Sequence, residues 1–258
     1  MSDQSQDPSL PETNPYQTPT SIPTPHVPSL AEGQGPYGPF INTHTLSRVV
    51  IGLVIASTVI EILMMLITAA ELNVLKSDGS GSYLEGLTHQ WIPLALSGSA
   101  ILFLILYIAT IVAFARWIIR SSKNAWLFSR QSNQFITTIT PGWAVGYYFI
   151  PIINLWKPYT AMREIRDATD QGILRGVLPF WWTTWVASAI LGQISFRLGN
   201  RADTIEKYIS SSVFDLVVLP LSLALSVLAI ILVRDITRAQ LERNGSHRGS
   251  GAAETPAL

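Results

Sequence analysis

Glu61 is the residue whose type and position most clearly suggest chemistry. It lies near the middle of the apolar run 49–70, VVIGLVIASTVIEILMMLITAA. Placing an ionised carboxylate at this depth in a membrane costs several kcal/mol unless the group is paired, hydrated or protonated. In one interpretation, the carboxylate lines a polar cavity and responds to protons or cations. In the other, it is a protonated or hydrogen-bonded group that faces neighbouring helices, and Ser57, Thr58 and Asn154 are its candidate partners.

The residue types that enzymes use for catalysis form no recognisable constellation in this sequence. The four histidines lie in polar tails and loops, cysteine is absent, and no HExxH, GxSxG or phosphate-binding glycine loop occurs. The sequence therefore predicts a protein that is not an enzyme, with no catalytic residue, cofactor or metal site. Seventeen basic residues balance seventeen acidic ones, so nucleic acid is not an expected partner.

A second unusual stretch, Pro141–Tyr159, reads PGWAVGYYFIPIINLWKPY. Its apolar part, 143–156, would form about 21 Å of helix, which is shorter than the roughly 30 Å of a bilayer core. Pro151 removes a backbone donor, so we expect a break between Tyr147 and Pro151. Length alone leaves open whether this segment crosses the membrane or re-enters on the same side.

Four longer apolar runs predict the elements that position these residues. They cover about 49–70, 92–119, 177–197 and 213–233, and each is long enough for a spanning helix. Only 13% of the residues are charged, against roughly 25% in soluble domains. We predict an all-α integral membrane protein: a bundle of four full transmembrane helices plus a short re-entrant or fifth membrane segment at 141–157.

Two polar flanks enclose this predicted transmembrane domain, residues 48–234. Residues 1–47 are rich in Pro, Ser, Thr and Gln and poor in large aliphatic side chains, which predicts a disordered tail. Residues 235–258 form a second polar tail. Both tails are expected to lie outside the membrane.

The positions of basic residues favour re-entry of the short segment. Because Lys and Arg near span ends prefer the cytoplasm, a cytoplasmic N-terminus combined with five spans would place eight basic residues on the unfavourable side. Re-entry returns all eight to the cytoplasm: Lys157, Arg163, Arg166, Arg175, Arg234, Arg238, Arg243 and Arg248. We therefore prefer four spans, and five spans remain the alternative.

The residues after Pro158 predict an amphipathic helix at the cytoplasmic surface. Tyr159, Met162, Ile165 and Ala168 recur at helical spacing, while charged side chains occupy the other face. Such a helix packs on the bundle or recognises lipid or a partner.

The stretch PGWAVGYYFIPIINLWKPYTAMREI resembles the signature of a bacterial family called domain of unknown function 4328. The resemblance extends from about Arg48 to Val233, and it includes the Trp117–Asn124 region and Trp181 with Trp182. It implies a multi-pass protein of the bacterial cytoplasmic membrane without a settled activity. Carried onto this sequence, the signature residues are Pro141, Gly142, Trp143, Pro151, Asn154, Trp156, Lys157, Pro158 and Glu164.

The leading functional prediction is a scaffold or sensor that acts through the Asn154–Glu164 junction, with the lipid bilayer and a protein partner or second copy as its partners. Asn154 is expected to bridge the broken backbone, Lys157 to meet a lipid phosphate or a helix C-terminus, and Glu164 to pair with a basic residue. Trp156 and Tyr159 are expected to set the depth of the segment. The alternative is a channel or transporter in which Glu61 and the broken helix near Pro151 line a pathway.

Overall fold

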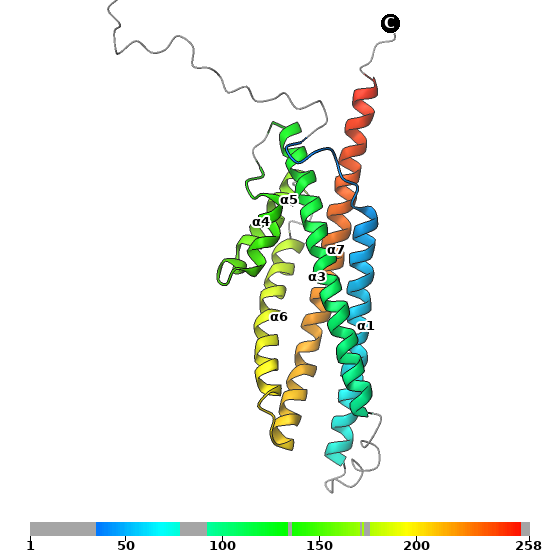
Figure 1. Cartoon of the computed structure of the whole chain (residues 1–258), viewed down its shortest axis with the longest axis vertical. Coiled ribbons are helices and arrows are strands. Elements are labelled where there is room, and N and C mark those ends of the chain that lie inside the picture. Colours follow the sequence, from blue (N-terminus) through cyan, green and yellow to red (C-terminus); the bar gives the residue numbers. More distant parts are fainter. Residues whose placement is uncertain (1–34, 78–91, 134–135, 171, 173–175, 254–258) are drawn as a thin grey trace, which may run out of the picture. The chain divides into compact units, whose positions relative to one another are not determined.

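The computed structural model describes residues 35–77, 92–133, 136–170, 172 and 176–253. Their secondary structure is helical apart from turns and one isolated bridge between Gly35 and Gly38. In chain order the elements are α1 (His44–Ser77), α3 (Ile92–Gln131), α4 (Pro141–Gly146), the 3₁₀ turns η1 (Tyr147–Phe149) and η2 (Ile153–Leu155), α5 (Lys157–Thr169), α6 (Val177–Gly199) and α7 (Ile205–Ala253) (Figure 1). The all-helical prediction is confirmed for the described residues.

Three of the long helices are long and apolar enough to cross a membrane. The qualifying segments lie at His44–Ala70 in α1, Gly98–Gln131 in α3 and Ile205–Ser246 in α7. In the most apolar stretch of α1 and of α3 only 6% is buried within the chain, and in α7 only 11%. Side chains of this kind need an apolar medium around them, as lipid provides. The chain is therefore a membrane protein.

The predicted fourth span corresponds to α6, which is not among the three qualifying helices. The helix contains three tryptophans together with Thr, Ser, Gln193 and Arg197, and these residues lower its mean hydropathy. Its length of 23 residues gives about 35 Å of helix.

The long helices pack in a bundle in which α1 contacts both α3 and α7, and α6 contacts α7. Figure 1 shows α4 and α5 beside the C-terminal half of α3, near the start of α6. Helix α5 itself contacts α3, α6 and α7. Helices α4 and α5 thus lie against the bundle at one of its ends.

The buried hydrophobic residues are concentrated at this same end. The cluster includes Val50 at the start of α1, Trp117 in the second half of α3, Leu178 at the start of α6 and Ile236 in the second half of α7. Helix α5 contributes Pro158, Ala161, Met162, Ile165 and Ala168. Of the face that helical spacing predicted, Met162, Ile165 and Ala168 are buried, and Tyr159 is partly buried against the cluster. The C-terminal part of α3 and the beginning of α6 therefore lie close together.

Two segments that the sequence assigned to polar tails pack in the structure. Tyr37 lies edge-on to Trp126, with ring centroids 5.6 Å apart. Gly35 approaches α3 so closely that an added Cβ would lie 3.0 Å from the Leu127 Cα. At the other terminus, α7 continues beyond residue 234, and Gln240 is buried. Packing therefore begins before residue 48 and extends past residue 234.

Candidate functional site

The short segment, residues 141–157, is broken in the region that Pro151 predicted. Helix α4 ends at Gly146, and η1 and η2 follow on either side of a tight turn. In this turn the Ile153 N–H donates to the Pro151 carbonyl at 2.8 Å. Ile152 has φ 69° and ψ −55°, the rare γ-turn conformation that a β-branched side chain adopts only under strain. The segment is a compact reversal of the chain and not a continuous helix.

The short segment is attached to α6 through aromatic side chains. The Trp182 indole N–H donates to the Leu155 carbonyl at 3.0 Å. The Tyr148 ring stands edge-on to Trp185 with centroids 5.7 Å apart, and Trp182 stacks on Trp185 at 4.8 Å. Such ring contacts add to the burial of apolar area. The segment therefore folds back onto the first half of α6.

The outer surface of the short segment is strongly apolar. Its large hydrophobic residues with about half or more of their surface exposed are Trp143, Phe149, Ile152, Leu155 and Trp156. Trp143 also packs on Tyr147, with ring centroids 5.2 Å apart. An exposed apolar tip of this kind is suited to contact with lipid.

Glu164 connects α5 to the loop that precedes α4. Its Oε2 accepts the backbone N–H groups of Thr138 at 2.8 Å and Ile139 at 2.9 Å. Its Oε1 accepts the Thr138 hydroxyl at 2.6 Å. The expected basic partner is therefore replaced by backbone donors, and this carboxylate fastens the start of the short segment to the helix that follows its end.

Asn154 and Lys157 also differ from expectation. The Asn154 backbone N–H donates to the Ile150 carbonyl at 3.0 Å, whereas its side chain makes no hydrogen bond among the described residues. The Lys157 ammonium lies 5.7 Å from the centroid of the Tyr147 ring, within range of a cation–π contact. The amide of Asn154 thus remains available at the edge of the segment.

The prolines and Gly142 have different surroundings. Pro141 occupies the first turn of α4 and Pro158 the first turn of α5, and both are buried. Pro151 is exposed. A Cβ added to Gly142 would meet no heavy atom within 4 Å. Close approach of another helix therefore does not explain this glycine within the described residues.

Glu61 forms a hydrogen bond with α7, and its partner there was not among the candidates taken from the sequence. Its Oε1 accepts a hydrogen bond from the Ser222 hydroxyl of α7 at 2.6 Å. One turn earlier, the Thr58 hydroxyl donates to Ser226 of α7 at 2.9 Å. Neither Ser57, Thr58 nor Asn154 hydrogen-bonds the carboxylate. These two polar pairs link α1 to α7, which supports the interpretation of Glu61 as a hydrogen-bonded group facing another helix.

Arg243 of α7 joins the C-terminal ends of two other helices. Its Nη1 donates to the carbonyls of Ala168 at 2.6 Å and Thr169 at 2.9 Å, at the end of α5. Its Nη2 donates to the Ser132 hydroxyl at 2.6 Å and to the Phe128 carbonyl at 3.4 Å, at the end of α3. The last carbonyls of a helix lack intrahelical donors and carry partial negative charge, so the guanidinium satisfies the last two carbonyls of α5. At the end of α3 it adds a donor to the Phe128 carbonyl, which already accepts the Ser132 N–H.

One turn before Arg243, Gln240 is fully buried and connects three segments. Its Nε2 donates to the Ser121 carbonyl at 3.0 Å and to the Thr169 hydroxyl at 3.3 Å. Its Oε1 accepts from Asn124 at 3.0 Å. We call Asn124, Thr169, Gln240 and Arg243 the polar junction.

Asn124 extends the polar junction to the N-terminal segment. Its Oδ1 accepts the Ile41 N–H at 2.8 Å, and its Nδ2 donates to the Ile41 carbonyl at 2.9 Å. Asn124 is only 1% exposed, so its amide oxygen and nitrogen find their hydrogen-bond partners within the protein and not in water. One asparagine thereby holds residues 35–43 against α3.

Sequence reasoning missed most of the polar junction. Asn124 belonged to the region that carried the family resemblance, but Gln240 and Arg243 were assigned to a polar tail. The sequence did contain a signal for this helical face. Residues three apart lie on the same side of a helix, and this spacing groups Thr237, Gln240 and Arg243, next to Ile236. That face packs at the junction.

A family model described as domain of unknown function (DUF4328) matches residues 94–238, more than half of the chain. The match begins within α3, later than the resemblance from Arg48 predicted, so α1 and Glu61 lie outside it. It includes the short segment, α5, α6 and most of the apolar part of α7. No curated protein and no solved structure matches this chain.

Proposed function

The chain belongs to the DUF4328 family, and on this premise we propose that it is a non-enzymatic multi-pass membrane protein that acts as a scaffold through the Asn154–Glu164 junction. The observation that carries the proposal is the attachment of the short segment at both ends. Glu164 holds the loop before α4, and Trp182 holds Leu155. These contacts give α5 and the segment one orientation for a protein partner.

The proposal includes four membrane spans, with α6 as the fourth. Support comes from the length of α6, from the buried cluster that joins the end of α3 to the start of α6, and from the basic residues that re-entry places in the cytoplasm. The short segment then dips into the cytoplasmic leaflet of a bacterial cytoplasmic membrane. Both chain termini lie in the cytoplasm.

Cysteine accessibility tests this topology, because the chain contains no native cysteine. Single cysteines at exposed Asn133, Asp170, Asn200 and Ser246 are treated in intact cells with a thiol reagent that does not cross the membrane. We expect Asn133, Asp170 and Ser246 to be protected and Asn200 to react. All four should react after the cells are opened, which controls for burial. Opposite behaviour of Asn133 and Asp170 would show that the short segment spans.

The scaffold function predicts that the Asn154 amide and the Lys157 ammonium help to hold a protein partner. In the double variant Asn154→Ala with Lys157→Ala, proteins that remain bound after purification in mild detergent should decrease at least about fivefold, as expected for loss of two polar contacts. Quantitative mass spectrometry of the purified sample measures this.

The matched control removes an asparagine and a lysine from the other end of α6 and α7, as Asn200→Ala with Lys207→Ala. Both residues are exposed. The control should retain the bound proteins. An unchanged set of bound proteins in the Asn154 and Lys157 variant, at normal folding, contradicts the scaffold function.

The transporter alternative has less support. It requires Glu61 and the broken segment to line one pathway, yet Glu61 hydrogen-bonds Ser222 between α1 and α7. The cavity that borders Asn154 is lined by α6 and the short segment and does not include Glu61.

A further inference from the structure

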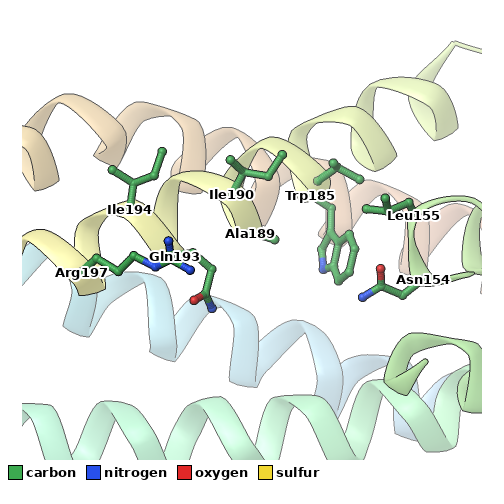
Figure 2. Close-up of a pocket in the computed structure, with 9 residues that line it drawn as sticks. Asn154, Leu155, Trp185, Ala189, Ile190, Gln193, Ile194 and Arg197 are labelled. Carbon is green, nitrogen blue, oxygen red and sulfur yellow. The ribbon is translucent and has the colours of Figure 1, made fainter. Parts of the chain in front are cut away.

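A groove runs along α6 from the short segment toward the C-terminal end of the helix. It encloses about 460 Å³. Figure 2 shows Asn154 beside Trp185 at one end of the groove and Arg197 at the other. Along α6 it is bordered by Trp185, Ala189, Gln193 and Arg197, spaced four residues apart, and by an adjacent aliphatic row. This spacing places each row on one side of the helix.

The polar end of the groove carries an unpaired positive charge. Among the described residues, Arg197 takes part in no ion pair or hydrogen bond, and Gln193 likewise makes no hydrogen bond. Ser195 lies on the opposite side of α6, where its hydroxyl donates to Asp215 of α7. The row that contains Gln193 and Arg197 therefore faces away from α7, with its donors unsatisfied.

The dimensions of the groove match one leaflet. Trp185 and Arg197 are twelve residues apart, which corresponds to about 18 Å along a helix. Half of a bilayer core is roughly 15 Å thick. If Arg197 lies at the headgroup level, the groove ends near the bilayer centre, where the tip of the short segment closes it.

We propose that this groove binds one anionic glycerophospholipid. Its phosphate accepts hydrogen bonds from the Arg197 guanidinium and the Gln193 amide, and one acyl chain follows the aliphatic row to Trp185 and Leu155. A guanidinium matches the phosphate geometry and charge, and the apolar wall matches the chain. The proposal rests on α6 crossing the membrane, as proposed above.

The test titrates purified protein in detergent with dioleoyl phosphatidylglycerol or dioleoyl phosphatidylcholine and counts bound lipids by native mass spectrometry. We expect one phosphatidylglycerol to bind about tenfold more tightly than phosphatidylcholine. Arg197→Gln should remove this preference. Arg201→Gln, which neutralises an exposed arginine one turn later and outside the groove, should retain it.

A second variant tests the apolar part of the groove without changing its charge. Ala189→Trp places an indole in the cavity and should reduce binding of phosphatidylglycerol about tenfold or more, while the unfolding transition stays near that of the wild type. Three results would each overturn the proposal. They are an equal loss of the phosphatidylglycerol preference in Arg197→Gln and Arg201→Gln, equal affinity of the wild type for the two lipids, and undiminished phosphatidylglycerol binding by Ala189→Trp. A dimer that forms without added lipid and cross-links through a cysteine placed at residue 189 would also overturn it, because a second copy of the chain would then cover the groove. If the cysteines react as the four-span topology predicts but the protein shows no preference for phosphatidylglycerol, the lipid site is rejected and the topology stands.

Discussion

Replacing Arg243 with alanine is expected to lower the free energy of unfolding by about 2–4 kcal/mol. The substitution removes the donors for the Ala168 and Thr169 carbonyls and for the Ser132 hydroxyl. It also removes the guanidinium that lies 4.9 Å from the Phe128 ring centroid. Since each partner group loses a charge-assisted hydrogen bond near the ends of α3 and α5, the apparent Tm in detergent should fall by roughly 5–15 °C.

Arg238 supplies a matched control on the same helix. Its side chain is 77% exposed and pairs with Glu242 at 2.8 Å, an arrangement that contributes little in water. Arg238→Ala should therefore leave the apparent Tm nearly unchanged. Arg243→Lys should recover part of the stability because it keeps the charge but loses the planar fork. Equal melting of the Arg243→Ala and Arg238→Ala proteins would contradict the role assigned to Arg243.

Asn124→Asp is expected to destabilise the protein by about 3 kcal/mol and to release residues 35–43 from α3. The change keeps the side-chain shape but replaces the NH₂ donor with an acceptor. That acceptor would face the Ile41 carbonyl and the Gln240 Oε1, both of which now receive hydrogen bonds from Nδ2. A buried carboxylate must then either remain charged without a donor or bind a proton, and either state costs free energy.

Limited proteolysis with chymotrypsin measures the release directly. Tyr37 and Phe40 now pack on Trp126 and Phe128, so cleavage after these residues should be slow in the wild type and faster in Asn124→Asp. Gln131→Glu makes the same amide-to-acid change at an exposed position of α3 and should leave the cleavage rate unaltered. Unchanged cleavage in Asn124→Asp would show that Asn124 does not hold the segment.

Together these contacts define how the proposed scaffold is assembled. The polar junction ties the N-terminal segment, α3, α5 and α7 to one another, while Glu164 and the α6 tryptophans hold the short segment. In the proposed topology both sets lie toward the cytoplasmic side. A partner that docks on α5 would therefore meet a surface whose position is coupled to the membrane helices.

The sequence by itself determined the membrane character, the helical class and the break near Pro151. These follow from local properties: runs of apolar residues long enough to cross lipid, backbone groups that must be satisfied within each helix, and a proline without an N–H. The apolar face of α5 and the family signature could also be predicted from the sequence. Each of these properties depends on neighbours a few positions apart.

Only the tertiary structure decided which distant residues meet. Ser222 as the partner of Glu61, backbone donors as the partners of Glu164, and the two helix ends joined by Arg243 depend on residues 25 to 161 positions apart in the chain. Hydrogen bonding is short-ranged and directional, so a polar residue read in sequence reveals that it needs a partner but not which helix supplies it. Residues 35–43 were assigned to a polar tail although they include Tyr37, Phe40 and Ile41, and the helical turns after residue 234 are mostly polar. Their packing arises only because α3 and α7 present complementary buried groups.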